Sequence, residues 1–309
     1  MWILSWNTRG MNSNVKFSEL RRFIRTYRIE FVLLQETKKE DIKDVEISRL
    51  WCDDEFDFKF SKAMGRFGGL LTVWDKNSFQ ILDSLITERF ILIEGKYALD
   101  DSICSVLNVY APCEVSEQIP LWNVIVEARR KYNNKWFMAG DFNAIRNLSE
   151  RSGCSYRQTQ IAAFNEFIEE CNLVDMPLSG RKFTWFGLAN RKSRLDRILV
   201  EDEWFQVNSD VSLLGLPRTV SDHIPILLGK ETIDWGPRPF KLVNNWLKQE
   251  SCTEVIKKVF QQEEARDEEL SVKLRRVKEE LKRWNTQCYW NVDSEAKKLE
   301  KRINELDGK

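Results

Sequence analysis

The segment Trp136-Phe137-Met138-Ala139-Gly140-Asp141-Phe142-Asn143 decides how this chain is interpreted. Its first four residues are apolar and predict a buried strand, and Gly140 begins the turn that follows. A carboxylate at Asp141 and an amide at Asn143 therefore project beyond the end of that strand. Asp141 could orient or deprotonate a water molecule, and Asn143 could hold that water or a phosphate. A turn that uses Gly and Asn for backbone reasons has the same appearance.

Short apolar runs alternate with amphipathic stretches on both sides of this segment. Helical spacing occurs at 17–27 and 161–168, so strands and helices share one domain over residues 1–230. The expected fold class is α+β. The expected strands are Trp2–Trp6, Phe31–Gln35, Leu70–Trp74, Ile103–Tyr110, Trp136–Ala139, Lys182–Trp185, Arg194–Val200 and Ile224–Leu228.

The composition changes at Asp234–Pro239, where two prolines and a glycine break any regular element. We expect a linker over residues 231–250 and an amphipathic helical tail over residues 251–309. Apolar residues recur every three or four positions over Leu270–Trp284 and again over Val292–Leu306, which puts each set on one helix face. A helical hairpin is expected, packed on itself or on the main domain. A coiled coil or a partner-docking role is the alternative.

The overall charge does not identify a nucleic-acid binder, because 48 basic residues balance 48 acidic ones. The stretch Arg181–Arg197 is basic, with Asp196 as its single acid, and it suits either a phosphate backbone or a solvated loop. The apolar runs are too short for a membrane helix, and the start lacks a secretion signal, so we expect a soluble intracellular protein. Seven cysteines without C-x-x-C spacing indicate reduced thiols and no structural zinc site.

Oxygen-bearing side chains follow other expected strands. Asn7 ends the first strand and Glu36 follows the second. A few hard oxygen ligands suit Mg²⁺, which keeps waters and a substrate phosphate in its shell. Each residue alone also suits a turn or a helix cap. Tyr110 ends a further strand, where it can donate to a phosphate oxygen or pack as a half-buried aromatic.

The only histidine, His223, directly follows Asp222. Neighbours on an extended chain face opposite ways, so adjacency does not make Asp222 the partner of the imidazole. Asp196 is the candidate to orient His223. Along the strand that contains it, alternation places Asp196 and Arg197 on opposite faces.

Seven segments, taken in order, closely resemble the endonuclease/exonuclease/phosphatase superfamily over nearly all of residues 1–230. These segments are Asn7, Gln35-Glu36, Asn108–Pro112, Gly140–Asn143, Phe183–Trp185, Arg194–Ile198 and Ser221–His223. Within the superfamily, the chain looks most like the apurinic/apyrimidinic-like endonuclease domain of LINE-type non-LTR retrotransposon ORF2 proteins, particularly plant ones. The segments behind this narrower resemblance are Trp2–Gly10, Gly68–Leu70, Glu150–Gly153, Arg238–Lys241 and Leu281–Asn285.

The resemblance implies a four-layer α-β-β-α sandwich of two packed sheets flanked by helices, with a C-terminal helical extension and an active site at one rim. It implies that Glu36, with Asn7 and Asp222, binds Mg²⁺ or Mn²⁺. It also implies that Asp141 activates the attacking water with help from Asn143.

Five further roles follow from the same resemblance. Tyr110 would contact the scissile phosphate. His223, oriented by Asp196, would stabilise the phosphorane-like transition state or pass a proton. Thr184 and Ser221 match supporting positions. Because many animal relatives have His at the position of Arg197, no catalytic role is transferred to that residue.

The implied reaction is the nicking of one strand of double-stranded DNA to leave 3′-hydroxyl and 5′-phosphate ends, as target-primed reverse transcription requires. Arg9, Arg191 and Lys192 are the DNA-contact candidates, and the loop Phe186–Ser193 is expected to tune target preference. A nuclear location follows from this substrate. The helical tail would contact a reverse-transcriptase region absent from this chain, or another protein.

Other interpretations remain open at the sequence level. One is another phosphoesterase of the superfamily, such as an abasic-site repair endonuclease or an inositol polyphosphate phosphatase. A second is a non-catalytic DNA- or protein-binding module whose function lies in the tail. The chain ends at Lys309 without a reverse transcriptase, which suggests a truncated element or a derived host gene. Because every core catalytic residue type is present, we expect an intact active site.

Overall fold

A computed structural model describes residues 1–51, 54–64, 67–155, 157–208, 210–230, 250–261, 270–284 and 305. The chain divides into two compact units, one containing β1 to β16 and the other containing the helices α6 (Glu250–Gln261) and α7 (Leu270–Trp284). Apart from Glu250 and Glu305, the predicted linker over 231–250 and the apolar face over 292–306 lie outside the described residues.

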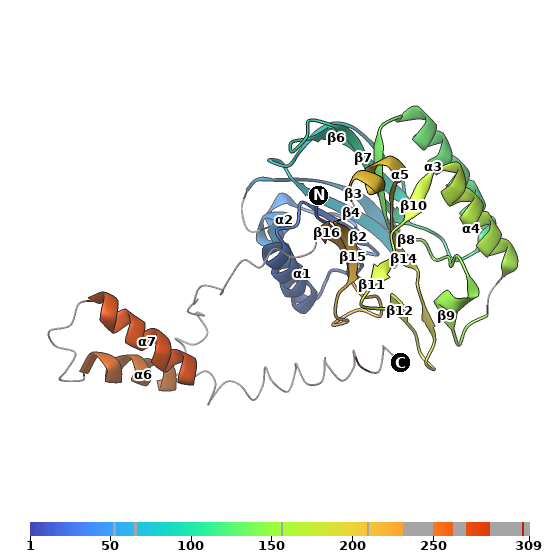
Figure 1. Ribbon diagram of the computed structural model, residues 1–309. Helices are drawn as coiled ribbons and strands as arrows, with labels where there is room; N and C mark the ends of the chain where they lie inside the picture. Colours follow the sequence, from blue (N-terminus) through green and yellow to red (C-terminus); the bar gives the residue numbers. More distant parts are fainter. Residues whose placement is uncertain are drawn as a thin grey trace. The chain divides into compact units, whose positions relative to one another are not determined.

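Two mixed sheets form the centre of the first unit (Figure 1). The first sheet, in the order β11-β15-β16-β1-β2-β4-β3, consists of Leu178–Ser179, Val211–Gly215, Ile226–Lys230, Ile3–Asn7, Phe31–Gln35, Phe67–Asp75 and Phe56–Met64. The second sheet, in the order β10-β14-β8-β7-β6-β5, consists of Leu173–Asp175, Asp196–Glu201, Lys135–Asp141, Ile103–Tyr110, Phe90–Tyr97 and Phe79–Ile86.

Helices cover the outer face of each sheet. The helices α1 (Asn14–Tyr27) and α2 (Asp44–Trp51) share one apolar core with the first sheet. The helices α3 (Val115–Lys131) and α4 (Gln158–Glu170) share a second core with the other sheet, on the opposite side of the molecule (Figure 1). A third core lies between the sheets. These layers confirm the predicted four-layer sandwich, and the short helix α5 (Asp202–Val207) follows β14.

The central strands are apolar on both faces because both faces are covered. Every residue of β1 and β2 is buried, as are all but the first residue of β8. The observed bounds of β2 and β7 match the predicted strands Phe31–Gln35 and Ile103–Tyr110. The sheets therefore form a rigid frame whose strand ends can hold polar side chains in place.

The predicted strand Lys182–Trp185 is wrong for most of its length. Only Trp185 belongs to a strand, the short β12 (Trp185–Phe186), which pairs with β13 (Lys192–Ser193). β13 also pairs with β9 (Arg151–Ser152), which follows the 3-10 turn Leu148–Glu150. The Thr184 side chain is turned inward to bind the backbone of a neighbouring strand, so this segment does not continue the ladder.

None of the helices in the described part of the chain has the length and apolar character that a membrane span requires. The described cysteines Cys104, Cys113, Cys154, Cys171 and Cys252 have free thiols.

Candidate active site

The ends of five central strands bring the predicted polar residues to one rim of the sandwich. β1 and β2 run parallel and end together, with Asn7 opposite Gln35. β7 and β8 also run parallel, with Tyr110 opposite Asp141 at their shared end. β14 runs antiparallel to β8, so that its first residue, Asp196, lies opposite Asp141. Residues far apart in the sequence therefore converge because of strand direction and register.

Gly140 places Asp141 at the end of β8. Its φ is +151°, and a Cβ atom there would collide with the backbone of Val109 on β7. The next polar residue, Asn143, adopts a left-handed φ of 48°. Its backbone N–H donates to Asp141 Oδ1 at 3.1 Å, and its side-chain amide donates to the Ala111 carbonyl at 2.9 Å. This closed turn fixes both side chains that the sequence places beyond the strand.

Thr184 positions Asp196. The Thr184 hydroxyl oxygen accepts hydrogen bonds from the backbone N–H groups of Leu195 and Asp196, both at 2.9 Å. Since these groups bind a side chain, β14 begins at Asp196 and not at the predicted Arg194. Thr184 is fully buried, and it holds the start of β14 at the rim.

Asp196 and Asp141 both approach the imidazole of His223. The Nδ1 atom of His223 lies 2.9 Å from Asp196 Oδ2, and its Nε2 atom lies 3.8 Å from Asp141 Oδ2. Ser221 supports this segment, because its hydroxyl donates to the Asn7 carbonyl at 2.9 Å and accepts from the His223 backbone N–H at 3.2 Å. The predicted Asp196–His223 contact is present. We refer to Asp141, Asp196 and His223 as the carboxylate–imidazole cluster.

Burial and neighbouring charges shift the pKa values of Asp141 and His223. Burial raises the pKa of the Asp141 carboxyl to about 7, since the attraction of His223 offsets only part of the desolvation and Asp196 adds repulsion. Burial alone would lower the pKa of His223, but the carboxylates of Asp196 and Asp141 outweigh it and raise that pKa to about 9. A carboxyl that titrates near neutrality suits proton transfer, and an imidazolium suits stabilisation of negative charge.

Asn7 joins this cluster to Glu36. The Asn7 Nδ2 group donates to Asp141 Oδ2 at 2.8 Å and to Glu36 Oε1 at 2.9 Å, while its Oδ1 accepts from the backbone N–H of Arg9 at 3.0 Å. Asn7 thus acts here as a donor between two carboxylates, and its predicted role as a metal ligand stays a prediction. Burial, together with the neighbouring Glu36 and Asp141 carboxylates, raises the pKa of Tyr110.

Oxygen donors at this rim fit a divalent cation. Glu36 has a left-handed φ of 49°, a conformation that costs a residue with a Cβ about 1 kcal/mol or more and that is concentrated at functional sites. Asp222 has one buried oxygen, Oδ1, without a hydrogen-bond partner. One ligand atom from each member of the carboxylate–imidazole cluster lies within 4.8 Å of the others. Carboxylate oxygens are the ligands that Mg²⁺ prefers.

The DNA-contact candidates have different surroundings. Arg9 is more than half exposed and forms an ion pair with Asp222 Oδ2. Arg191 is exposed, and its guanidinium lies 6.0 Å from the centre of the Trp185 ring. Lys192 has an exposed fraction of only 9%, so Arg191 is the more accessible of the two candidates in this hairpin.

Sequence reasoning did not assign roles to three further residues at the rim. The Trp185 indole N–H donates to Asp222 Oδ2 at 3.0 Å. The Lys38 Nζ atom lies 3.9 Å from Glu36 Oε2. The pKa of Lys16 is lowered, mainly by burial and secondly by the positive charge of Lys38. The sequence feature that could have indicated Lys38 is its position two residues after Glu36, just beyond the end of the same strand. Lys16 lies on α1, and only the folded chain brings it to the rim.

A second group of buried charges lies on the other face of β14. Arg197 is fully buried and donates to both Glu150 oxygens and to Asp175 Oδ2, the last at 2.5 Å. Arg194 donates to Asp175 Oδ1 at 2.9 Å, and Arg146 lies 3.5 Å from Asp175 Oδ2. The predicted alternation of Asp196 and Arg197 about β14 is therefore present. We call these five residues the ion-pair network.

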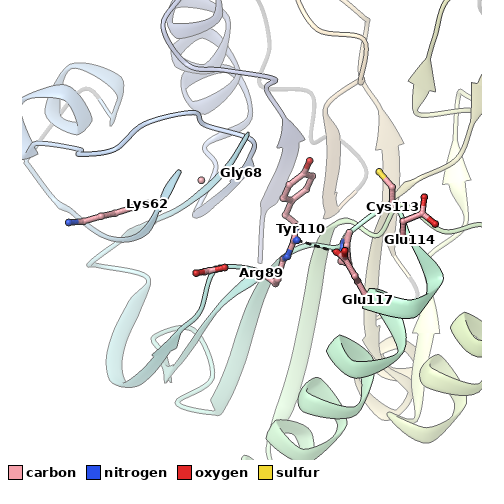
Figure 2. A pocket seen from close by; sticks show the side chains of 10 residues that line it. Lys62, Gly68, Arg89, Tyr110, Cys113, Glu114 and Glu117 are labelled. Atoms are coloured by element: carbon pink, nitrogen blue, oxygen red, sulfur yellow. Dashed lines mark hydrogen bonds and ion pairs between the residues drawn. The ribbon is translucent and has the colours of Figure 1, made fainter. Parts of the chain in front are cut away.

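A cavity of about 430 Å³ adjoins the rim at Tyr110. Figure 2 shows Tyr110 between the strand end that carries Gly68 and the loop that carries Cys113. The Arg89 guanidinium reaches toward Glu117, at a distance of 3.5 Å. The cavity therefore extends the rim beyond the residues that the sequence singles out, with a mixed-charge lining.

Comparisons with known proteins agree with this architecture. Residues 4–223 match the sequence profile of the Endonuclease/Exonuclease/phosphatase family. The structure is similar to an AP endonuclease of Leishmania major, with 17% identity over 74% of this chain and 86% of that one, at a TM-score of 0.60. No curated protein matches the chain.

Two other solved structures share the fold. One is the 3′ phosphatase NExo from Neisseria bound to a product DNA hairpin, with 15% identity over 75% of this chain and all of that one, at a TM-score of 0.57. The other is the endonuclease domain of TRAS1, a telomere-specific non-LTR retrotransposon, with 14% identity over 74% of this chain and 96% of that one, at a TM-score of 0.54.

Proposed function

Because the chain belongs to the endonuclease/exonuclease/phosphatase family, whose members hydrolyse phosphoester bonds, we propose that it is a metal-dependent DNA endonuclease that nicks one strand. The observation that carries the proposal is the convergence of Asp141, Asp196 and His223 with Glu36 at one rim. A LINE-type role in priming reverse transcription is the finer form of the proposal. The resemblance of the opening segment and the fold shared with the TRAS1 domain support it.

In the proposed reaction a water molecule attacks the scissile phosphorus and the bond from phosphorus to O3′ breaks. Asp141 takes the proton of the attacking water, since its pKa is raised toward neutrality and Asn143 holds the turn that aims it. His223, held by Asp196, stays protonated near neutral pH and stabilises the charge on the phosphate oxygens. The leaving oxygen gains a proton to become the 3′-hydroxyl, and the phosphate stays on the 5′ end.

A divalent cation would be held by Glu36, with Asp222 and Asn7 as further candidate ligands. When bound, Mg²⁺ or Mn²⁺ would polarise a phosphate oxygen and stabilise developing negative charge. Tyr110, whose pKa the neighbouring Glu36 helps to raise, would contact the same phosphate. The strand itself would pass the rim near Arg9 and Arg191.

The experiment that tests this proposal is the nicking of supercoiled plasmid with Mg²⁺, with and without EDTA. Wild type should convert the plasmid to open circles only with the metal, and Asp141→Ala and His223→Ala should not. The ends should carry 3′-hydroxyl and 5′-phosphate groups. If folded wild type leaves the plasmid intact, the endonuclease assignment is wrong.

A phosphatase or abasic-site endonuclease is the second candidate, because the family includes such enzymes and the Neisseria protein of the same fold is a 3′ phosphatase. Parallel assays on an intact duplex, an abasic duplex, a 3′-phosphorylated end and a phosphoinositide separate the candidates. The endonuclease proposal requires cleavage of the intact duplex at a rate at least comparable to that of the others. Exchange of the loop Phe186–Ser193 should then change the cleavage pattern.

A further inference from the structure

The two helices of the second unit differ in charge. α7 contains six basic residues and two acidic ones, whereas α6 contains two of each. The whole chain has no net formal charge. Within the second unit, α7 therefore has the larger excess of basic residues.

α6 covers the apolar face of α7 from Val277 onward, while Leu274 on the same face is 53% exposed. Leu281 and Trp284 are buried together with Cys252, and Val277 packs against the same cluster. The Trp284 indole N–H also donates to the Ser251 hydroxyl at 3.1 Å. These contacts use the apolar face of α7 from Val277 onward, and the charged side chains of α7 remain toward solvent.

Three basic residues follow one line along a flank of α7. Arg275, Lys278 and Lys282 are spaced three and four residues apart, which places them on one side of the helix, bordering the buried face that contains Leu281. Arg275 and Lys282 are exposed and Lys278 is half-buried. The Lys282 Nζ atom lies 3.4 Å from Glu279 Oε1. We call these three basic residues the α7 basic stripe.

The spacing of the stripe suits a nucleic-acid backbone. Seven residues of α-helix span about 10 Å. One strand of duplex DNA presents a phosphate for about every 3.4 Å of its axis, and the two strands together present twice as many. Three cations within this length therefore meet a comparable number of phosphates. A membrane surface fits less well, since membrane binding needs a free apolar face and Val277, Leu281 and Trp284 of α7 are packed against α6.

We infer that the α7 basic stripe binds the phosphate backbone of duplex DNA, as a contact separate from the candidate active site. Duplex DNA is favoured over a single strand because its charge density is higher, about one charge per 1.7 Å of axis. The contact is independent of base sequence. It does not depend on cleavage, because it uses no residue of the rim.

The test is the binding of a labelled DNA duplex to the full chain in EDTA, where a metal-dependent nuclease cannot cut. Arg275→Glu with Lys282→Glu should weaken binding by about tenfold at moderate salt, and should lower the slope of log affinity against log salt by about 2. The matched control is Lys257→Glu with Lys258→Glu, which makes the same charge change at exposed positions of α6. This control should leave both quantities nearly unchanged.

Three outcomes would overturn the inference. Equal loss in the stripe and control variants would show a general charge effect. No loss in the stripe variant would show that α7 does not touch DNA. If the stripe variant lost binding to a single-stranded RNA probe but kept its binding to the DNA duplex, the stripe would be assigned to RNA instead. If circular dichroism shows that charge reversal unfolds α7, Arg275→Gln with Lys282→Gln replaces it, with an expected fall in salt slope in the same direction. Absence of nicking in the plasmid assay leaves these binding results interpretable.

Discussion

Two groups of buried charges lie on opposite faces of β14, and they are compensated differently. In the ion-pair network, each carboxylate oxygen of Glu150 and Asp175 faces at least one arginine or backbone N–H. In the carboxylate–imidazole cluster, Asp141 and Asp196 share one histidine. The adjacent residues Asp196 and Arg197 belong to different groups, because successive side chains of a strand point to opposite faces.

The pKa values of Glu150 and Asp141, one carboxyl from each group, shift in opposite directions. Burial alone would raise the pKa of Glu150, but Arg197 outweighs it and the net shift is downward. Burial raises the pKa of Asp141, and its single cationic neighbour does not compensate. A carboxylate that is satisfied by arginines serves stability, whereas an under-compensated one is costly to bury and is therefore typical of a site that does chemistry. Compensation, and not burial, distinguishes the two groups.

The largest expected effect concerns the carboxylate–imidazole cluster. Asp141→Asn should reduce the nicking rate by about 10³-fold or more, because it removes the base. Since the folded pKa of Asp141 is raised, its ionised form destabilises the fold at pH 7, and the same variant should be more stable by about 1 kcal/mol. Single-turnover nicking and urea unfolding measure the two quantities. A clear loss of stability would remove the contrast between the groups.

The opposite pattern is expected for the ion-pair network. Arg197→Met should destabilise the fold by about 3–5 kcal/mol, because it leaves two buried carboxylates with fewer cations. Nicking per folded molecule should stay near that of wild type at low temperature. Urea unfolding monitored by tryptophan fluorescence gives the free energy. A variant as stable as wild type would mean that Arg194 and Arg146 alone satisfy Glu150 and Asp175.

A smaller effect is expected from metal binding. Mg²⁺ at ten times its dissociation constant should stabilise the wild-type fold by about 1.4 kcal/mol, because it binds only the folded chain. Glu36→Gln should remove this increment, while Glu19→Gln, at a half-buried carboxylate of α1 that pairs with Arg22, should keep it. Thermal unfolding with and without Mg²⁺ measures the difference. An undiminished increment in Glu36→Gln would place the cation elsewhere, for example at the carboxylate–imidazole cluster.

The smallest effect is a pH dependence that belongs to the ion-pair network. Because the pKa of Glu150 is lower in the folded than in the unfolded state, its contribution to stability is present above the unfolded value of about 4.3. This contribution is lost as the pH falls through the folded value. The gap in unfolding free energy between wild type and Glu150→Gln should thus shrink between pH 6 and pH 3. A constant gap would mean that Glu150 acts through packing alone.

Much of the frame was predictable because it depends on local patterns. The apolar runs that become β2 and β7 lie between polar turn residues, so even their ends are visible in the chain. The helix α3 was not assigned, and it contains Pro120, which interrupts a helical pattern. The strands β5 and β6 were also not assigned. β5 is mostly exposed and lies at the edge of its sheet, so it lacks a strong apolar signal.

The amino-acid sequence by itself determined the fold class and which polar residues stand at strand ends, because periodicity and strand termination are properties of neighbouring residues. Only the tertiary structure decided which of these groups meet. The approach of His223 to both Asp196 and Asp141, the inward turn of Thr184 and the pairing of Arg197 with Glu150 depend on strand order and register across the whole domain. Such contacts join segments far apart in the chain, and no local pattern encodes them.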